Sequence, residues 1–88
     1  MNAQRSLFHD QTPTVDEIMS VWQSDREFRS RLQICEALGR AKSPALIAVI
    51  TVLQNIGYLT VREVTLPNRI VMYQYSPSEK WYAEGLPF

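Results

Sequence analysis

The segment Ser43-Pro44-Ala45-Leu46-Ile47-Ala48-Val49-Ile50-Thr51-Val52-Leu53-Gln54-Asn55-Ile56 runs into Gly57-Tyr58-Leu59 and then into two stretches rich in β-branched residues. The serine can cap a helix, and the proline suits its first position because no amide hydrogen is needed there. Gly57 tolerates the left-handed conformation that often ends a helix. This stretch therefore predicts one helix that leads directly into a β-hairpin.

The predicted helix carries no Lys, Arg, Asp or Glu between Pro44 and Ile56. Helical spacing assigns one apolar face to the core: Leu46, Val49, Ile50 and Leu53. The opposite face is also largely apolar: Ile47, Ala48, Thr51, Val52 and Asn55. Because an 88-residue chain cannot bury both faces internally, we expect the second face to contact DNA, a second subunit or another protein.

Two further helices are expected before this one. Thr14 with Glu17, and Ser24 with Glu27, have the spacing of a capping box, in which a hydroxyl and a glutamate side chain bond reciprocally to backbone amides. The first helix, over residues 15 to 22, has an apolar stripe of Val15, Ile18, Met19 and Trp22. The second has a stripe of Phe28, Leu32, Cys35 and Leu38, with Arg29, Arg31 and Gln33 outward, and ends at Gly39. We assign Trp22, Phe28 and Cys35 to the core.

The chain after Tyr58 alternates apolar and polar residues with a period of two, which indicates strands on both sides of the turn Leu66-Pro67-Asn68-Arg69. With Val61 opposite Tyr73, the core face would carry Leu59, Val61, Val71, Tyr73 and Tyr75. A third capping box, Ser76 with Glu79, predicts a short last helix that carries Trp81 and Tyr82. We expect this helix to fold back on the domain or to pack across a dimer axis, and we favour the second.

Length and composition point to a single small globular domain, with nine basic and nine acidic residues. The longest apolar run is far shorter than the ~20 residues that cross a bilayer, and no apolar signal segment is seen, so we expect a cytoplasmic protein. One cysteine and one histidine, His9, offer no disulfide or metal-ligand spacing. With no nucleophile and base pair or phosphate-binding glycine loop either, we expect a protein that is not an enzyme and needs no cofactor.

Two sequence stretches resemble a known family. Glu36-Ala37-Leu38-Gly39, followed by a serine-initiated helix and Leu53-Gln54-Asn55-Ile56-Gly57-Tyr58-Leu59, resembles the helix-turn-helix of winged-helix regulators of the MarR and PadR kind. Tyr73-Gln74-Tyr75-Ser76-Pro77 resembles the end of their second wing strand. The resemblance covers about residues 14 to 85 and implies an α+β winged helix-turn-helix: three helices, a two-stranded β-hairpin wing and a short C-terminal helix. A flexible N-terminal arm at 1–13 and a tail at 86–88 would flank this domain.

The resemblance implies a small dimeric DNA-binding regulator of transcription, with the third helix in the major groove and the wing near phosphates or the minor groove. The predicted contacts with double-stranded DNA are Arg40, Lys42, Ser43, Thr51, Arg62, Asn68 and Arg69. The alternative is a winged-helix module that binds another protein, such as an assembly factor or a phage or plasmid inhibitor of a host complex. The predicted interface for a second copy or a protein partner comprises Ile47, Val52, Ile70, Met72, Trp81 and Tyr82.

Overall fold

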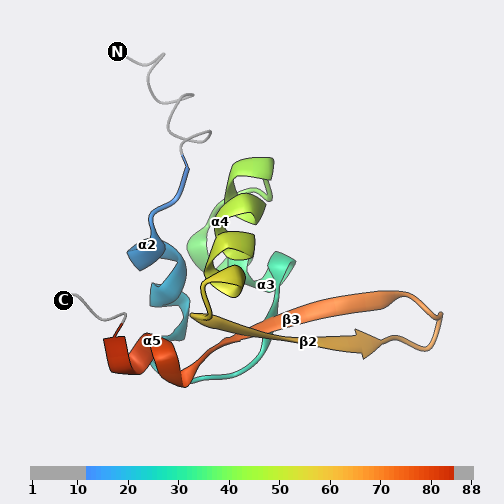
Figure 1. The fold of residues 1–88 in the computed structure, drawn as a ribbon. Coiled ribbons are helices and arrows are strands. Elements are labelled where there is room, and N and C mark those ends of the chain that lie inside the picture. The colour runs from blue at the N-terminus through green and yellow to red at the C-terminus, as the bar shows by residue number, and fades with distance from the viewer. Residues whose placement is uncertain (1–11, 85–88) are drawn as a thin grey trace, which may run out of the picture.

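The structure, a computed structural model, describes residues 12–84. Over this range the chain forms α2 (Val15–Met19), the 3-10 turn η1 (Ser20–Trp22), β1 (Arg29–Ser30), α3 (Arg31–Leu38), α4 (Pro44–Asn55), β2 (Leu59–Thr65), β3 (Val71–Pro77) and α5 (Glu79–Glu84). The strands form one antiparallel sheet in the order β1-β3-β2. The helices gather at one end of this sheet, and the β2–β3 hairpin projects away from them (Figure 1). The predicted α+β class is confirmed for the described residues.

The ends predicted as an arm and a tail lie almost entirely outside the described residues. Of the expected arm, only Thr12 and Pro13 are described, and Pro13 is buried. The tail at 86–88 and His9 fall in the remainder. Within the described part, no helix is long and apolar enough to cross a bilayer.

Local capping chemistry sets several helix boundaries as predicted. The amide of Glu17 donates to Thr14 Oγ1 at 3.0 Å, and the amide of Leu46 donates to Ser43 Oγ at 3.2 Å, with proline at the first turn of α4. Gly39 ends α3 with a φ of 67°, a left-handed conformation in which a side chain would be strained. The chain reversal between α3 and α4 is therefore built from signals that are visible in the sequence.

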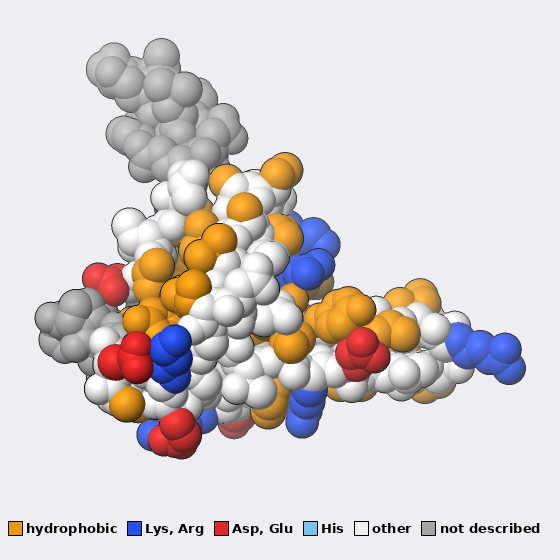
Figure 2. All heavy atoms as spheres, viewed as in Figure 1, with side chains coloured by type: hydrophobic (Ala, Val, Ile, Leu, Met, Phe, Trp, Pro, Cys, Tyr) orange, Lys and Arg blue, Asp and Glu red, His pale blue; other side chains and the backbone are white. Residues whose placement is uncertain are grey.

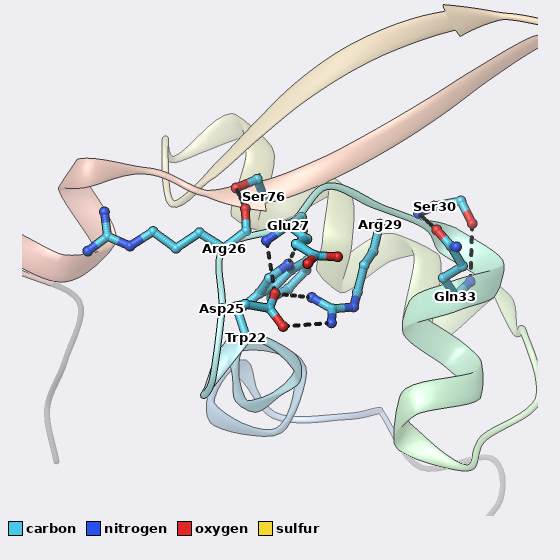
Figure 3. Close-up of polar contacts among 8 residues, drawn as sticks. All are labelled: Trp22, Asp25, Arg26, Glu27, Arg29, Ser30, Gln33 and Ser76. Carbon is cyan, nitrogen blue, oxygen red and sulfur yellow. Dashed lines mark hydrogen bonds and ion pairs between the residues drawn. The ribbon is translucent and has the colours of Figure 1, made fainter.

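The predicted start of the second helix at Ser24 is wrong. The helix starts instead after Ser30, whose hydroxyl accepts from the Gln33 amide while the Gln33 side chain accepts from the Ser30 amide (Figure 3). Residues 23–28 form a loop that leads into β1, and β1 pairs with β3 through Arg29 opposite Tyr75 and Ser30 opposite Gln74. Because Arg29 and Ser30 pair in the sheet, the helix cannot begin before Arg31.

The same kind of error occurs at the start of α5. Ser76 belongs to β3 rather than to a helix cap, and its hydroxyl donates to the backbone oxygen of Arg26 at 2.7 Å (Figure 3). The α5 helix begins after Ser78, whose hydroxyl oxygen accepts from the Trp81 amide at 3.4 Å. The second serine in Ser76-Pro77-Ser78-Glu79 is therefore the capping residue.

The hairpin turn at residues 66–69 is confirmed, because the Arg69 amide donates to the Leu66 oxygen at 2.8 Å. The predicted register is wrong by two residues: Val61 lies opposite Tyr75, and Glu63 lies opposite Tyr73. Thr65 and Val71 form the last pair, which leaves five residues for the connection where the predicted register would leave three. A shift of two keeps every side chain on its predicted face, since side chains alternate with a period of two. The assignment of that whole face to the core is wrong, because Val71 and Tyr73 lie beyond the helices and are 46% and 42% exposed.

The core lies where α2, α3, α4 and α5 meet the base of the hairpin. It comprises Ile18, Met19, Trp22, Ile34, Cys35, Leu46, Ile50, Leu53, Leu59, Tyr75 and Trp81. Burying one such large side chain stabilises the fold by about 1.5–3 kcal/mol. The predicted stripe of α3 is wrong in part: Ile34 is buried, whereas Leu32 in the first turn of the helix is 58% exposed. Phe28 is only half-buried, beneath the guanidinium of Arg62 at 4.2 Å from its ring centre.

Candidate nucleic-acid interface

Ion pairs divide the cations of the described chain into two groups. Arg26 pairs with Glu79 at 3.2 Å, Arg29 with Asp25 at 2.8 Å and Arg40 with Glu17 at 2.9 Å. Within residues 12–84, no carboxylate pairs with the others: Arg31, Lys42, Arg62, Arg69 and Lys80. Within the described residues, these five cations are therefore the ones available to an anionic partner.

Arg40, predicted to contact DNA, is instead paired with an acidic residue of α2. Its Nε and Nη2 donate to the two carboxylate oxygens of Glu17 at 2.9 and 3.1 Å. Such a two-point contact is among the stronger side-chain interactions, and it ties the α3–α4 turn to α2. Because this guanidinium already has a carboxylate partner, we withdraw Arg40 from the predicted DNA contacts. The neighbouring cation in the same turn, Lys42, is exposed.

Two adjoining hollows lie between the helices and the hairpin, and they share Arg31 and Tyr73. One, of about 540 Å³, is lined by Arg31, Gln54, Val61, Arg62, Glu63, Tyr73 and Tyr75. The other, of about 330 Å³, lies between the start of α3, Lys42 and the distal part of β3. We call this second one the hairpin groove; its lining includes Arg31, Leu32, Lys42, Ile70, Val71 and Tyr73.

Arg31 is the central cation of these hollows, and the sequence interpretation missed it as a site residue. Its Nε donates to the hydroxyl of Tyr75 at 3.1 Å. Its guanidinium carbon lies 5.9 Å from the Tyr75 ring centre and 6.0 Å from that of Tyr73, within the range of cation–π attraction. The capping pattern Ser30-x-x-Gln33 could have placed Arg31 at the first position of α3, but nothing local in the sequence indicates its tyrosine partners.

Several predicted DNA contacts already make bonds within the chain. Ser43 caps α4, the Thr51 hydroxyl donates to the Ile47 oxygen at 3.0 Å, and Asn68 Oδ1 accepts from the Ile70 amide at 3.1 Å. Arg62 donates from Nε to Gln74 Oε1 at 2.8 Å, on the strand face opposite Tyr73 and Tyr75. Arg69 lies exposed in the hairpin turn with a φ of 67°.

The predicted interface residues are separated by the fold. Val52 on α4 and Ile70 on the hairpin are 53% and 57% exposed, whereas Ile47 and Met72 are half-buried. Tyr82 is half-buried, with the guanidinium carbon of Arg26 3.9 Å from its ring centre. Assigning Trp81 to an interface was wrong: it is only 4% exposed and packs edge-on against Tyr58, with ring centres 5.4 Å apart. The short last helix therefore folds back on its own domain.

The loop before β1 contains the carboxylate most perturbed by its surroundings. Asp25 accepts two hydrogen bonds from the Arg29 guanidinium and one from the Glu27 amide (Figure 3). These bonds, that from Arg29 first, lower the pKa of Asp25 from 3.8 to about 2. Nearby, Trp22 Nε1 donates to the Glu27 backbone oxygen at 2.7 Å, which joins this loop to the core.

This lowered pKa predicts a defined acid dependence of stability. Because the folded state favours ionised Asp25, its contribution is complete above about pH 4 and is lost as the pH falls toward about 2. We expect Asp25→Asn to be less stable than the parent at pH 6, with the difference shrinking toward pH 2. Urea unfolding at pH 6, 4 and 2.5 measures this. A difference that stays constant over that range would contradict the assignment.

The described residues do not meet the requirements of a metal site or of a reactive cysteine. Residues 12–84 contain no group of three or more His, Cys, Asp or Glu residues arranged to hold a metal ion. Cys35 is buried as predicted, and burial raises the pKa of its thiol, which favours the unreactive protonated form. Comparison with protein-family models, with curated proteins and with solved structures gives no match for this chain.

Proposed function

We propose that this chain is a small winged-helix protein that binds double-stranded DNA and regulates transcription in the cytoplasm. The main support for this proposal is that some basic side chains form ion pairs within the described residues whereas others do not. Intramolecular ion pairs engage Arg26, Arg29 and Arg40, while Lys42 beside α4 and Arg69 in the hairpin turn keep their charges available. Figure 2 shows basic side chains beside α4 and at the tip of the hairpin, on either side of the space that these elements enclose.

The arrangement of elements supports the same proposal. A helix, a short strand and two helices joined by a tight turn precede a hairpin, and β1 ties the base of that hairpin to the helices. In a helix-turn-helix protein the second helix of the pair enters the major groove, and this helix is α4 here. Lys42 lies next to Ser43, the residue that caps α4, so a duplex placed against the start of α4 would bring a phosphate within its reach.

Base reading by α4 is expected to be weak. Direct readout uses mainly bidentate Arg, Lys, Asn or Gln contacts, and the first turns of α4 offer alanines and a threonine whose hydroxyl already donates to a backbone oxygen. Phosphate contacts would then supply most of the affinity, as in nonspecific binding with a Kd on the order of 10⁻⁴–10⁻⁶ M at physiological salt. On this proposal the protein binds DNA and carries out no catalysis.

The test is a fluorescence anisotropy titration of a labelled random duplex with the full chain at low salt. We expect saturable binding in the micromolar range. A flat titration up to the highest soluble protein concentration would overturn the proposal. The same titration with an unlabelled competitor of different sequence measures how little the protein discriminates between bases.

We also propose that the protein acts as a homodimer through the C-terminal part of the outward face of α4, which leaves the start of the helix beside Lys42 to DNA. Val52 and Ile56 are 53% and 43% exposed, and Val15 on α2 is 38% exposed. Figure 2 shows hydrophobic side chains along the visible face of α4, a helix without charged residues. A second copy would meet this face without any like-charge repulsion from α4 itself.

Introducing a charge on this face is expected to change the mass of the protein in solution. Val52→Glu would place a carboxylate opposite its own symmetry mate or against apolar side chains, so the dimer should dissociate. Light scattering after size exclusion should then change from twice 10.2 kDa to 10.2 kDa. Thr60→Glu, an exposed position on β2, is the matched control and should leave the mass of the parent unchanged. A monomeric parent protein would contradict the dimer.

The exposed apolar side chains of the hairpin favour a second candidate function, a winged-helix module that binds another protein. Ile70, Val71 and Tyr73 are 57%, 46% and 42% exposed. An exposed apolar surface of this kind commonly marks a protein interface.

A further inference from the structure

Contacts with DNA phosphates leave four exposed apolar side chains at the start of α3 and on the hairpin without a role. Leu32, Ile70, Val71 and Tyr73 are between 42% and 58% exposed, and all four line the hairpin groove. Phosphate oxygens offer no favourable partner to such side chains. Apolar side chains that cluster in a groove, rather than lying singly over the surface, are typical of a protein recognition site.

One wall of the hairpin groove is the edge of a β-strand. β1 pairs only with Tyr75 and Gln74 of β3, because the chain turns into α3 at Arg31. Beyond that point Val71–Tyr73 pairs with β2 on one side, and no strand of the described chain pairs with it on the other. Such an edge presents backbone groups to which another extended chain can add.

The charged residues that line the hairpin groove are both positive, and Glu63 lines only the adjoining hollow. Arg31 and Lys42 line the groove, no Asp or Glu is among its lining residues, and neither cation has a carboxylate partner within residues 12–84. The Tyr75 hydroxyl fixes the direction of Arg31 through the 3.1 Å bond from its Nε. The groove therefore combines a strand edge, apolar walls and two available positive charges.

From this combination we infer that the hairpin groove binds an extended acidic and apolar segment of a partner protein. The segment adds to β3 as an antiparallel strand in line with β1. Its alternate apolar side chains face Leu32, Val71 and Tyr73, and its carboxylates meet Arg31 and Lys42. This inference rests on the second candidate function, deepens it by naming the class of partner, and does not depend on DNA binding.

Selection from a displayed library of random 12-residue peptides on the full chain tests the inference. We expect the enriched peptides to alternate apolar residues with Asp or Glu. Synthetic copies should lose affinity by about tenfold or more on Leu32→Glu, because a carboxylate would then replace an apolar contact and lie close to the acidic side chains of the peptide. Thr60→Glu adds the same charge on the outer face of β2 and should leave the affinity unchanged. Amides of Val71–Tyr73 should also gain protection from hydrogen exchange when peptide binds.

Three outcomes would overturn the inference. These are a library that yields no enriched sequence, enriched peptides that bind Leu32→Glu as tightly as the parent, and enriched peptides that are acidic at every position without apolar residues. The last would indicate simple attraction of anions to Arg31 and Lys42. Since the peptide assay contains no duplex, its failure and the failure of DNA binding are observed separately.

Discussion

Replacing Trp81 with alanine is expected to lower the free energy of unfolding by about 3–5 kcal/mol. The indole is 4% exposed and packs edge-on against Tyr58, and it is the buried residue of α5. Its removal would leave a cavity between the last helix and the chain that follows α4. Because a small domain has a total stability of about 5–15 kcal/mol, the variant should be close to its unfolding threshold at room temperature.

Urea unfolding followed by circular dichroism measures this loss. Leu32→Ala is the control, since Leu32 is 58% exposed and its truncation should change the stability by no more than about 0.5 kcal/mol. Equal stability losses for the two variants would contradict the position of Trp81 in the core. That result would return Trp81 to the surface, where a role in a subunit interface would again be open.

Reversing two charges, in the variant Lys42→Glu with Arg69→Glu, is expected to weaken duplex binding by on the order of 100-fold. Lys42 lies beside the start of α4, and Arg69 lies in the hairpin turn. Each reversal removes one phosphate contact and adds a repulsive charge, so each alone should cost about tenfold. Anisotropy titrations at one fixed low salt concentration measure the affinities of the parent, the two single variants and the double variant.

Lys80→Glu provides the matched control for these reversals. Lys80 has no carboxylate partner within residues 12–84, and its Nζ donates to the Ile56 oxygen just after the end of α4, the opposite end of the helix from Lys42. We expect Lys80→Glu to weaken binding by less than about threefold, through the general change in net charge. If Lys80→Glu and Lys42→Glu weaken binding equally, the protein has no localised DNA site at the start of α4.

Features that depend on neighbouring residues in the sequence were predictable. Ser43 and Pro44 fix the start of α4, and the glycine at position 39 ends α3 in the left-handed conformation that only glycine adopts without strain. The hairpin turn at 66–69 and the two faces of its strands follow from turn residues and alternation. Each of these features needs only a few adjacent residues.

Features that depend on distant partners were not predictable. Ser24-x-x-Glu27 and Ser30-x-x-Gln33 both have the spacing of a capping box, and the pairing of β1 with β3 decides between them. Arg40 looked like an available charge until the fold placed Glu17 beside it, 23 positions away in sequence. Arg31 became a groove residue through Tyr75, 44 positions away. The candidate site is therefore harder to predict from the sequence than the helices and strands on which its residues lie.

Binding of DNA through phosphate contacts is best tested by the slope of the logarithm of the duplex association constant against the logarithm of salt concentration. Each phosphate neutralised by a lysine or arginine contributes about −0.9 to this slope. With contacts from Lys42 and Arg69, we expect a slope of about −2 per protomer, and a slope of about zero for the double charge reversal. Absence of duplex binding, or a slope that the double reversal leaves unchanged, would contradict this expectation.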